Sequence, residues 1–458
     1  MVFIYETIED LISYSKEAEG EYLKDLDNKN LIEKTNKGIV GSVIEQSFFG
    51  YDANSKAEAD FADIGVELKT TGIIKQKRGD LAAKERLVLN IINYMDEIDR
   101  SFLTSSMWTK NNKILIFFYT YVRDSNGRAD YPHFQIVKTI LHEFSEIDLE
   151  IIKQDWNIIQ DKVRNGLAHE LSEGDTNILG ASTKGASSKS VREQPFSDIP
   201  AKQRAYSLKQ GYMTSLVRQY IKKEKLISFT SPENLKKNSI EDIIKSHFDK
   251  YIGKNEEEIA NLLGHSLSTA KNNMQLLISE ILGIKGTSLN RIEEFAKLNI
   301  KFKTVVYEKS GILRESMSFE NIDFDEIYNV EWEESELKMK MESTQWLLVV
   351  FQRNEQGQRV LKGIKLWHLP ENHLNNEIKH MYEEIKRLLI EGINIQVDKK
   401  GRYENNLPKS NFNGISHVRP KGINREKSMI TLPNGQRIPN QAFWFNAKYI
   451  KSLTKDLL

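Results

Sequence analysis

The sequence predicts an α/β protein built from two tandem copies of one domain, each a mixed central sheet flanked by helices. The first observation is a segment, Asp60–Lys69, that recurs in altered form as Glu294–Lys303. The second is an apolar run over Ile114–Tyr119, typical of a buried strand, whose counterpart is Trp346–Phe351. The third is the length of 458 residues, which accommodates two domains of ordinary size.

The repeated segment of the first copy predicts a strand with one polar face. Over Ile64–Thr70 successive side chains point to opposite faces, so Glu67 and Lys69 share one face. Their apolar neighbours, Val66 and Leu68, can anchor the other face in a core. A carboxylate and an ammonium group therefore stand side by side on one surface.

A second carboxylate can join this surface. Asp60 precedes Glu67 and can return to it through a turn, for which Gly65 permits a close backbone approach. Two carboxylates that share a site repel each other, and a hard divalent cation such as Mg²⁺ relieves the repulsion. Such a cation polarises a phosphoryl oxygen and lowers the pKa of a bound water, which Lys69 would orient. The alternative is a surface strand with a Glu–Lys ion pair of little energetic weight.

Two flanking segments complete this region. Lys37–Gly50 predicts a short helix that ends at Gly50. Glu45 lies at the edge of its apolar face, where a charge is costly without a partner. Downstream, Ile114–Tyr119 is predicted to be the buried central strand.

These segments together resemble the MutH-like nuclease superfamily, whose members share the PD-(D/E)xK restriction-endonuclease-like fold. The likeness extends along the chain to GATC-specific type II restriction endonucleases of the Sau type. The segments that carry it are Lys37–Glu45, Asp60–Thr70, Lys84–Tyr94, Lys110, Ile152–Trp156, Ala168–Gly174 and Ala201–Ser215.

The resemblance implies a role for each residue of the first copy's site. Asp60 and Glu67 would be the metal ligands, with Mg²⁺ as the cofactor, and Lys69 would be the catalytic lysine. Glu45 would be a supporting carboxylate from the neighbouring helix, and Lys110 a further lysine of the site.

The DNA-reading region departs from the family pattern. Where MutH-like proteins carry Arg-Pro-Lys, the first copy has Ser182-Thr183-Lys184, without the arginine that could grip a guanine edge. Ser182, Thr183 and Tyr206 are the candidates for base contacts. Basic residues here are expected to contact phosphates, the alternative being a solvated helix face. The expected DNA contacts of the first copy are Lys37, Ser182, Thr183, Lys184, Arg204, Tyr206 and Lys209.

The second copy has exchanged its site but kept its DNA-reading segment. Lys301 stands where Glu67 stood, and with Lys303 it would repel a cation, so this copy is expected not to cleave. It retains Arg419-Pro420-Lys421, and Arg419 and Lys421 are expected to contact DNA. We expect it to bind a second recognition site or to regulate the first copy; the alternative is a purely structural role.

The expected domains are a catalytic domain over 1–225, a linker over 226–239 and a degenerate DNA-binding or regulatory domain over 240–458. The absence of cysteine excludes disulfides and cysteine-ligated zinc. Net charge is zero, with 65 basic and 65 acidic side chains, so DNA binding requires a local basic surface. No run is apolar enough to span a membrane and no signal sequence is evident, which predicts a cytoplasmic protein.

The leading functional prediction is a Mg²⁺-dependent type II restriction endonuclease that cuts double-stranded DNA at GATC and leaves 5′-phosphates. The alternatives are a strand-nicking repair endonuclease of the MutH kind and a DNA-binding protein that reads methylation state without cutting. The expected partners are double-stranded DNA and, in the host, a cognate GATC methyltransferase. The enzyme would act as a monomer or as a DNA-induced dimer.

Overall fold

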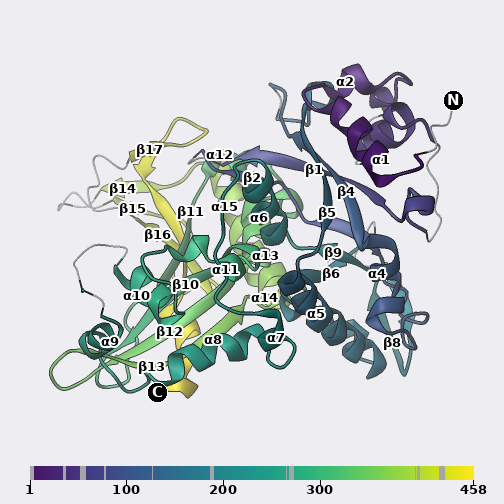
Figure 1. Cartoon of the computed structure of the whole chain (residues 1–458). Coiled ribbons are helices and arrows are strands. Elements are labelled where there is room, and N and C mark those ends of the chain that lie inside the picture. The colour runs from purple at the N-terminus through teal and green to yellow at the C-terminus, as the bar shows by residue number, and fades with distance from the viewer. Residues whose placement is uncertain are drawn as a thin grey trace. The chain divides into compact units, whose positions relative to one another are not determined.

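The computed structural model divides the chain into two compact units (Figure 1). Unit 1 comprises Met1–Ile240 and Arg291–Asn299, and unit 2 comprises Glu241–Asn290 and Ile300–Leu458. The structure describes residues 5–34, 38–51, 58–76, 79–125, 127–185, 190–264, 266–267, 273–397, 399, 403–421 and 429–458.

The strands of unit 1 form a four-stranded mixed sheet, a three-stranded sheet and a hairpin. They are β1 (Glu67–Lys75), β2 (Leu81–Ala83), β3 (Leu87–Ile91), β4 (Lys113–Thr120), β5 (Ile136–Glu143), β6 (Leu179–Thr183), β7 (Val191–Gln194), β8 (Ser197–Lys202) and β9 (Arg204–Leu208). The main sheet has the order β2-β1-β4-β5, with β1 parallel to β4 and β4 antiparallel to β5. The smaller sheet has the order β3-β9-β6.

The helices of unit 1 cover these sheets. They are α1 (Ile8–Ser15), α2 (Leu23–Leu26), α3 (Ile39–Ser42), α4 (Ser106–Asn111), α5 (Glu146–Arg164), α6 (Gln210–Tyr220), α7 (Pro232–Leu235) and α11 (Glu293–Lys297). The long helix α5 begins where the Ser145 hydroxyl accepts a hydrogen bond from the Asp148 N–H, a stabilising N-cap. One core of the unit joins the N-terminal helices to the face of β1 and β4 that carries Leu68 and Phe117.

Unit 2 contains corresponding strands. They are β10 (Ile300–Tyr307), β11 (Met317–Asn321), β12 (Gln345–Arg353), β13 (Arg359–His368), β14 (Ile395–Val397), β15 (Tyr403–Asn405), β16 (Ser416–Pro420), β17 (Met429–Thr431), β18 (Arg437–Pro439) and β19 (Gln441–Phe445). Its helices are α8 (Ile240–Asp249), α9 (Glu256–Leu263), α10 (Asn273–Ile281), α12 (Phe324–Asn329), α13 (Glu336–Ser343), α14 (Glu371–His373), α15 (Lys379–Glu391) and α16 (Ala447–Thr454). Its core includes Trp346, Tyr382 and Phe445.

The strand connectivity of unit 1 is repeated in unit 2. β10 pairs parallel with β12 and β12 pairs antiparallel with β13, as β1 does with β4 and β4 with β5. The order β11-β19-β16 repeats β3-β9-β6. Leu179 of β6 pairs with the last residue of β9, and Ser416 of β16 pairs with the last residue of β19. Three residues further along each strand, Ser182 corresponds to Arg419. Lys184 corresponds in the same way to Lys421. The predicted α/β fold with two tandem copies is confirmed.

The segment Arg291–Asn299 packs within unit 1. Ile292 forms a parallel bridge with Ile227, and Phe295 lies with its ring centroid 6.2 Å from that of Phe229. The Glu294 carboxylate accepts hydrogen bonds from the Ser228 hydroxyl and the Phe229 N–H. The part of the repeated segment that precedes β10, Glu294–Asn299, is therefore held in place by residues 227–229.

Local structure differs from expectation in two places. The helix expected over 37–50 consists of α3 followed by a π-helical turn, Val43–Phe48, and ends before Gly50 at φ 77°. The expected linker, residues 226–239, contains α7 and the Ile227 bridge, and its role as a linker stays a prediction. Across the described ranges, no helix has the length and apolar character needed to cross a bilayer.

Candidate active site

A closed turn brings Asp60 to Glu67. The Phe61 N–H donates to the Val66 carbonyl at 2.9 Å, and the Val66 N–H donates back to the Phe61 carbonyl at 3.2 Å. Gly65 closes the turn in the left-handed conformation, at φ 66°, which costs glycine little. The Asp60 N–H donates to Glu67 Oε2 at 3.2 Å, so the start of the turn is tied to the start of β1.

Two lysines converge on the Glu67 carboxylate. Lys69, two residues along β1, donates from Nζ to Glu67 Oε1, and Lys110 Nζ lies 3.6 Å from the same oxygen. Lys110 comes from α4, whose N-cap Ser105 accepts a hydrogen bond from the helix at 3.1 Å. The Glu67 side chain is 2% exposed, so its charge depends on these ammonium groups.

Three carboxylates share this electrostatic environment. Glu45 projects from the π-helical turn, a local geometry that recurs at functional sites. Burial, followed by the charge of Asp60, raises the pKa of Glu45 to about 6, while Lys69 opposes the rise. Burial also raises the pKa of Glu67, with Asp60 adding to it and Lys69 and Lys110 opposing it. Burial is the main cause of both rises, and the neighbouring carboxylates add to it.

The donor set fits a partly hydrated Mg²⁺. Magnesium is commonly held by one or two carboxylates, with water and substrate phosphate completing the octahedron. Asp60 and Glu67 supply two such carboxylates on adjoining backbone positions. Within the described ranges no group of three or more histidine, aspartate or glutamate side chains is placed to hold a metal ion. Any metal held by Asp60 and Glu67 would take its remaining ligands from water and substrate.

Tyr51 is a neighbour of the carboxylates that sequence reasoning missed. Its N–H donates to the Glu45 carbonyl at 3.2 Å, and its ring makes an edge contact with Phe61. Burial and then the charges of Asp60 and Glu45 raise the pKa of its phenol. The buried hydroxyl has no hydrogen-bond partner among the described residues. The left-handed Gly50, which turns the chain back toward Glu45, was the available signal.

Two predicted phosphate contacts are structural residues instead. Arg204 is 1% exposed, and its guanidinium donates to the carbonyls of Ala181 and Leu171. Lys209 is also buried, and its ammonium donates to the carbonyls of Glu173 and Thr176. The expectation that these two side chains contact DNA phosphates is therefore wrong for this structure.

Two predicted base contacts are buried as well. The Ser182 hydroxyl donates to the Ala205 carbonyl at 3.2 Å, across the β6–β9 pair. The Tyr206 hydroxyl accepts a hydrogen bond from Gln160 at 2.7 Å inside the core. Both side chains are occupied by the fold, which corrects their assignment as base contacts.

The other predicted DNA contacts differ in exposure from these. Thr183 and Lys184 are exposed at the end of β6. Arg419 is exposed, with its guanidinium 4.8 Å from the centroid of the Trp444 ring, and Lys421 is exposed just beyond β16. Lys37 lies outside the described residues.

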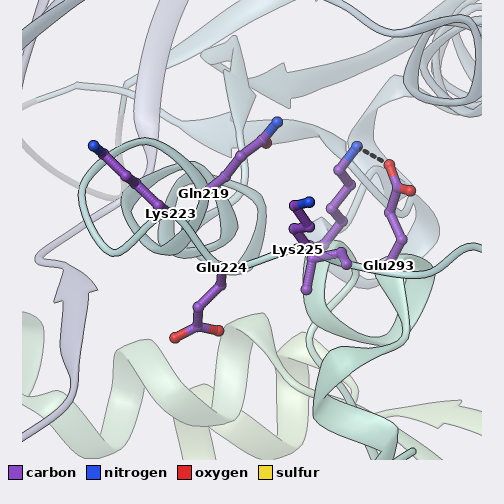
Figure 2. Close-up of a pocket in the computed structure, with 7 residues that line it drawn as sticks. Gln219, Lys223, Glu224, Lys225 and Glu293 are labelled. Atoms are coloured by element: carbon purple, nitrogen blue, oxygen red, sulfur yellow. Dashed lines mark hydrogen bonds and ion pairs between the residues drawn. The ribbon is translucent and has the colours of Figure 1, made fainter.

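A pocket of unit 1 lies apart from these groups in sequence, at the end of α6. It is lined by Gln219, Lys223, Glu224, Lys225, Leu226, Glu293 and Lys297. Figure 2 shows Gln219, Lys223 and Glu224 pointing in different directions. The Lys297 ammonium pairs with the Glu293 carboxylate. Because the polar groups do not converge, we assign this pocket no chemistry.

The first strand of the mixed sheet presents a buried glutamate and a lysine, and a turn brings an aspartate to them. This arrangement is characteristic of the restriction-endonuclease-like α/β nucleases. Comparison with known proteins places the chain in the same class. A family model described as the DNA mismatch repair enzyme MutH matches residues 49–155 and 282–380, in two separate segments. The type II restriction enzyme Sau3AI of Staphylococcus aureus is 37% identical across 99% of both chains. The chain belongs to the MutH-like restriction endonuclease family.

More distant relatives match less of the chain. The DNA mismatch repair protein MutH of Shewanella woodyi is 29% identical over 41% of this chain and 80% of its own length. The MutH of Pasteurella multocida is 27% identical over 34% of this chain and 67% of its own. The predicted family resemblance is confirmed, and the full-length match is to the restriction enzyme.

Proposed function

We propose that the chain is a Mg²⁺-dependent type II restriction endonuclease that hydrolyses double-stranded DNA at GATC sites, with unit 1 as the cleaving half. The observation that carries this proposal is the convergence of Asp60, Glu67 and Lys69 on one edge of a nuclease-type sheet. Likeness to Sau3AI over nearly the whole chain supports a restriction enzyme over other nucleases. GATC as the target rests on that family likeness.

The chain's own residues supply the polar groups that the reaction needs. When bound by Asp60 and Glu67, Mg²⁺ would polarise the phosphoryl oxygen and lower the pKa of a bound water. Lys69, already directed at Glu67, would orient the attacking water and offset charge on the phosphate. Glu45, with a pKa near 6, is suited to accept a proton from that water. In-line attack would break the P–O3′ bond, leaving a 5′-phosphate and a 3′-hydroxyl.

A strand-nicking repair endonuclease is the second candidate, favoured by the similarity to MutH. That similarity covers 41% of this chain, whereas the restriction enzyme matches both tandem copies. A protein that binds its site without cutting is the third candidate. It would gain nothing from two lysines gathered on the buried Glu67 carboxylate.

Digestion of plasmid DNA tests the proposal. Unmethylated and adenine-methylated plasmids are incubated with the full chain in Mg²⁺ or in EDTA, and the ends are sequenced. The control pair is Glu67→Ala, expected to bind without cutting, and Glu143→Ala, which removes an exposed glutamate from β5 of the same sheet.

The outcomes separate the three candidates. Double-strand ends at GATC, dependent on Mg²⁺ and on Glu67, would support the restriction enzyme and give its methylation rule. Nicked circles alone would favour the repair-type enzyme. Sequence-specific binding without any cutting would make the chain a recognition module.

A restriction endonuclease would act beside a protecting partner and in a defined oligomeric state. Cleavage at GATC would require a cognate methyltransferase to protect the host's own DNA in the cytoplasm. Sedimentation of the Glu67→Ala variant with one-site and two-site duplexes would distinguish a monomer from a DNA-induced dimer.

A further inference from the structure

The strand of unit 2 that corresponds to β1 carries two lysines on one face. Lys301 and Lys303 alternate on β10 as Glu67 and Lys69 do on β1. The parallel partner strand keeps the same register, with Lys301 opposite Trp346. Positive groups therefore occupy the positions that hold a carboxylate and a lysine in unit 1.

Lys303 is directed across the unit toward the smaller sheet. Its ammonium donates to the carbonyl of Ser318 on β11, and the side chain is half-buried. A half-buried lysine is unlike the solvated lysines of an ordinary surface, because its charge has lost part of its hydration. One backbone carbonyl leaves two of its three N–H donors available to another acceptor.

The charges around Lys303 are mostly of its own sign. Burial, followed by Lys421 and then Lys301, lowers its pKa to about 8, and Glu320 is the carboxylate that opposes this effect. Glu320 is itself shared, lying 3.4 Å from Lys301 Nζ and 4.0 Å from Lys340 Nζ. Clustered ammonium groups with so little countercharge are unfavourable unless an anion joins them.

Lys421 links this cluster to the retained DNA-reading segment. It directly follows β16, where Arg419 stacks on Trp444 with the guanidinium exposed. Its N–H donates to the Asn440 carbonyl at 3.0 Å, which fixes the backbone at this point. An arginine fork beside lysine point charges is a combination suited to phosphate groups.

We propose that Lys301, Lys303 and Lys421 form a metal-independent binding site in unit 2 for a phosphodiester group of duplex DNA. The site lies where unit 1 would hold its scissile phosphate against Mg²⁺, and fixed ammonium groups take the place of the ion. Without a metal-activated water the phosphate is bound and not hydrolysed. This inference rests on the proposed function, since it assumes that the chain binds DNA.

Acetylation footprinting of the full-length Glu67→Ala variant in EDTA tests the site directly. Lysine acetylation is measured by peptide mass spectrometry, without DNA, with a GATC duplex, and with inorganic phosphate at the same concentration of phosphate groups. The duplex is expected to slow acetylation of Lys301, Lys303 and Lys421, and inorganic phosphate to slow it much less. Lys309, exposed beyond the far end of β10, is the control.

Salt-dependent duplex binding by single variants in the same background provides the second measurement. Lys303→Met and Lys421→Met are each expected to reduce the slope of log affinity against log salt by about 0.9. Lys309→Met removes the same charge from the same unit and is expected to leave the slope unchanged.

The outcomes separate this inference from the proposed function. Duplex binding that protects Lys184 of unit 1 and leaves Lys303 as reactive as before would overturn the phosphate site alone. Equal protection by inorganic phosphate would overturn its assignment to duplex DNA. An absence of any duplex binding would overturn the proposed function itself.

Discussion

Lys297 donates hydrogen bonds to both carboxylate oxygens of Asp148, at 2.7 and 2.9 Å. Both side chains are buried, and the Tyr212 hydroxyl donates to Asp148 at 3.0 Å as well. Asp148 belongs to α5, Tyr212 to α6 and Lys297 to α11. A buried ion pair therefore holds α11 against two helices of unit 1.

Removing one partner of this pair is expected to destabilise unit 1. Lys297→Met leaves the Asp148 charge buried without its cation, which costs about 3–5 kcal/mol of unfolding free energy. Asp148→Asn combined with Lys297→Met removes both charges and is expected to lose less than the single variant. Urea unfolding, followed by hydrogen exchange in peptides from α5, α6 and α11, measures both. A double variant as unstable as Lys297→Met would show that the pair is not what stabilises α11.

The turn that positions Asp60 is expected to depend on residue 65. Gly65 has φ 66°, and the counterpart position in the second copy, Asn299, has φ 51°. Gly65→Ala forces a β-carbon into this conformation at about 1–2 kcal/mol, whereas asparagine adopts it more readily. DNA cleavage and thermal unfolding of Gly65→Ala and Gly65→Asn are compared. The asparagine variant should retain more of both, and equal losses would point to a cause other than backbone strain.

Stability is expected to fall with acid through His142. Burial lowers the pKa of His142 to about 4, with Lys297 adding to the effect and Asp148 opposing it. Because the folded pKa lies below the unfolded value of about 6.5, the neutral ring contributes stability above pH 6.5 that is lost as the pH falls toward 4. The expected loss is about 3 kcal/mol. His142→Gln should reduce the pH dependence of the unfolding free energy between about pH 6.5 and pH 4. If the pH dependence is unchanged, other groups cause it.

The two lysines near Glu67 are expected to contribute unequally to cleavage. Lys69 contacts Glu67 directly, whereas Lys110 Nζ lies 3.6 Å from the same carboxylate oxygen. Lys69→Met is expected to slow single-turnover cleavage by about 10²- to 10³-fold, as loss of a charge-stabilising donor does. Lys110→Met should slow it less. Identical rates for both variants would contradict the distinct roles that the distances indicate.

Arg204 is expected to matter for folding and not for DNA affinity. Its guanidinium joins the carbonyls of Ala181 and Leu171 inside unit 1. Arg204→Met leaves these buried carbonyls without a donor, at about 1–3 kcal/mol each. Thermal unfolding should detect the loss, while the salt slope of DNA binding stays that of the parent. A reduced salt slope would restore Arg204 as a phosphate contact.

The features that sequence predicted correctly depend on local geometry. Alternation along a strand places Glu67 and Lys69 on one face whatever surrounds them, and a glycine at residue 65 allows the return of Asp60. The predictions that failed depend on distant partners. In the sequence Arg204 has the pattern of a surface cation, and only the folded structure shows that it donates to the Leu171 carbonyl. Tyr206 sits on β9, the central strand of its sheet, which alternation over so few residues does not reveal.

The segment of the second copy that matches Asp60–Glu67 takes part in the packing of unit 1. Glu294 stands where Asp60 stands, but its carboxylate secures Ser228 and Phe229. A glutamate placed at residue 301 would supply one carboxylate, while the Glu294 carboxylate would stay hydrogen-bonded to Ser228 and Phe229. A single substitution at residue 301 would therefore not reproduce the arrangement of unit 1, because the carboxylate at residue 294 is already bonded within the fold.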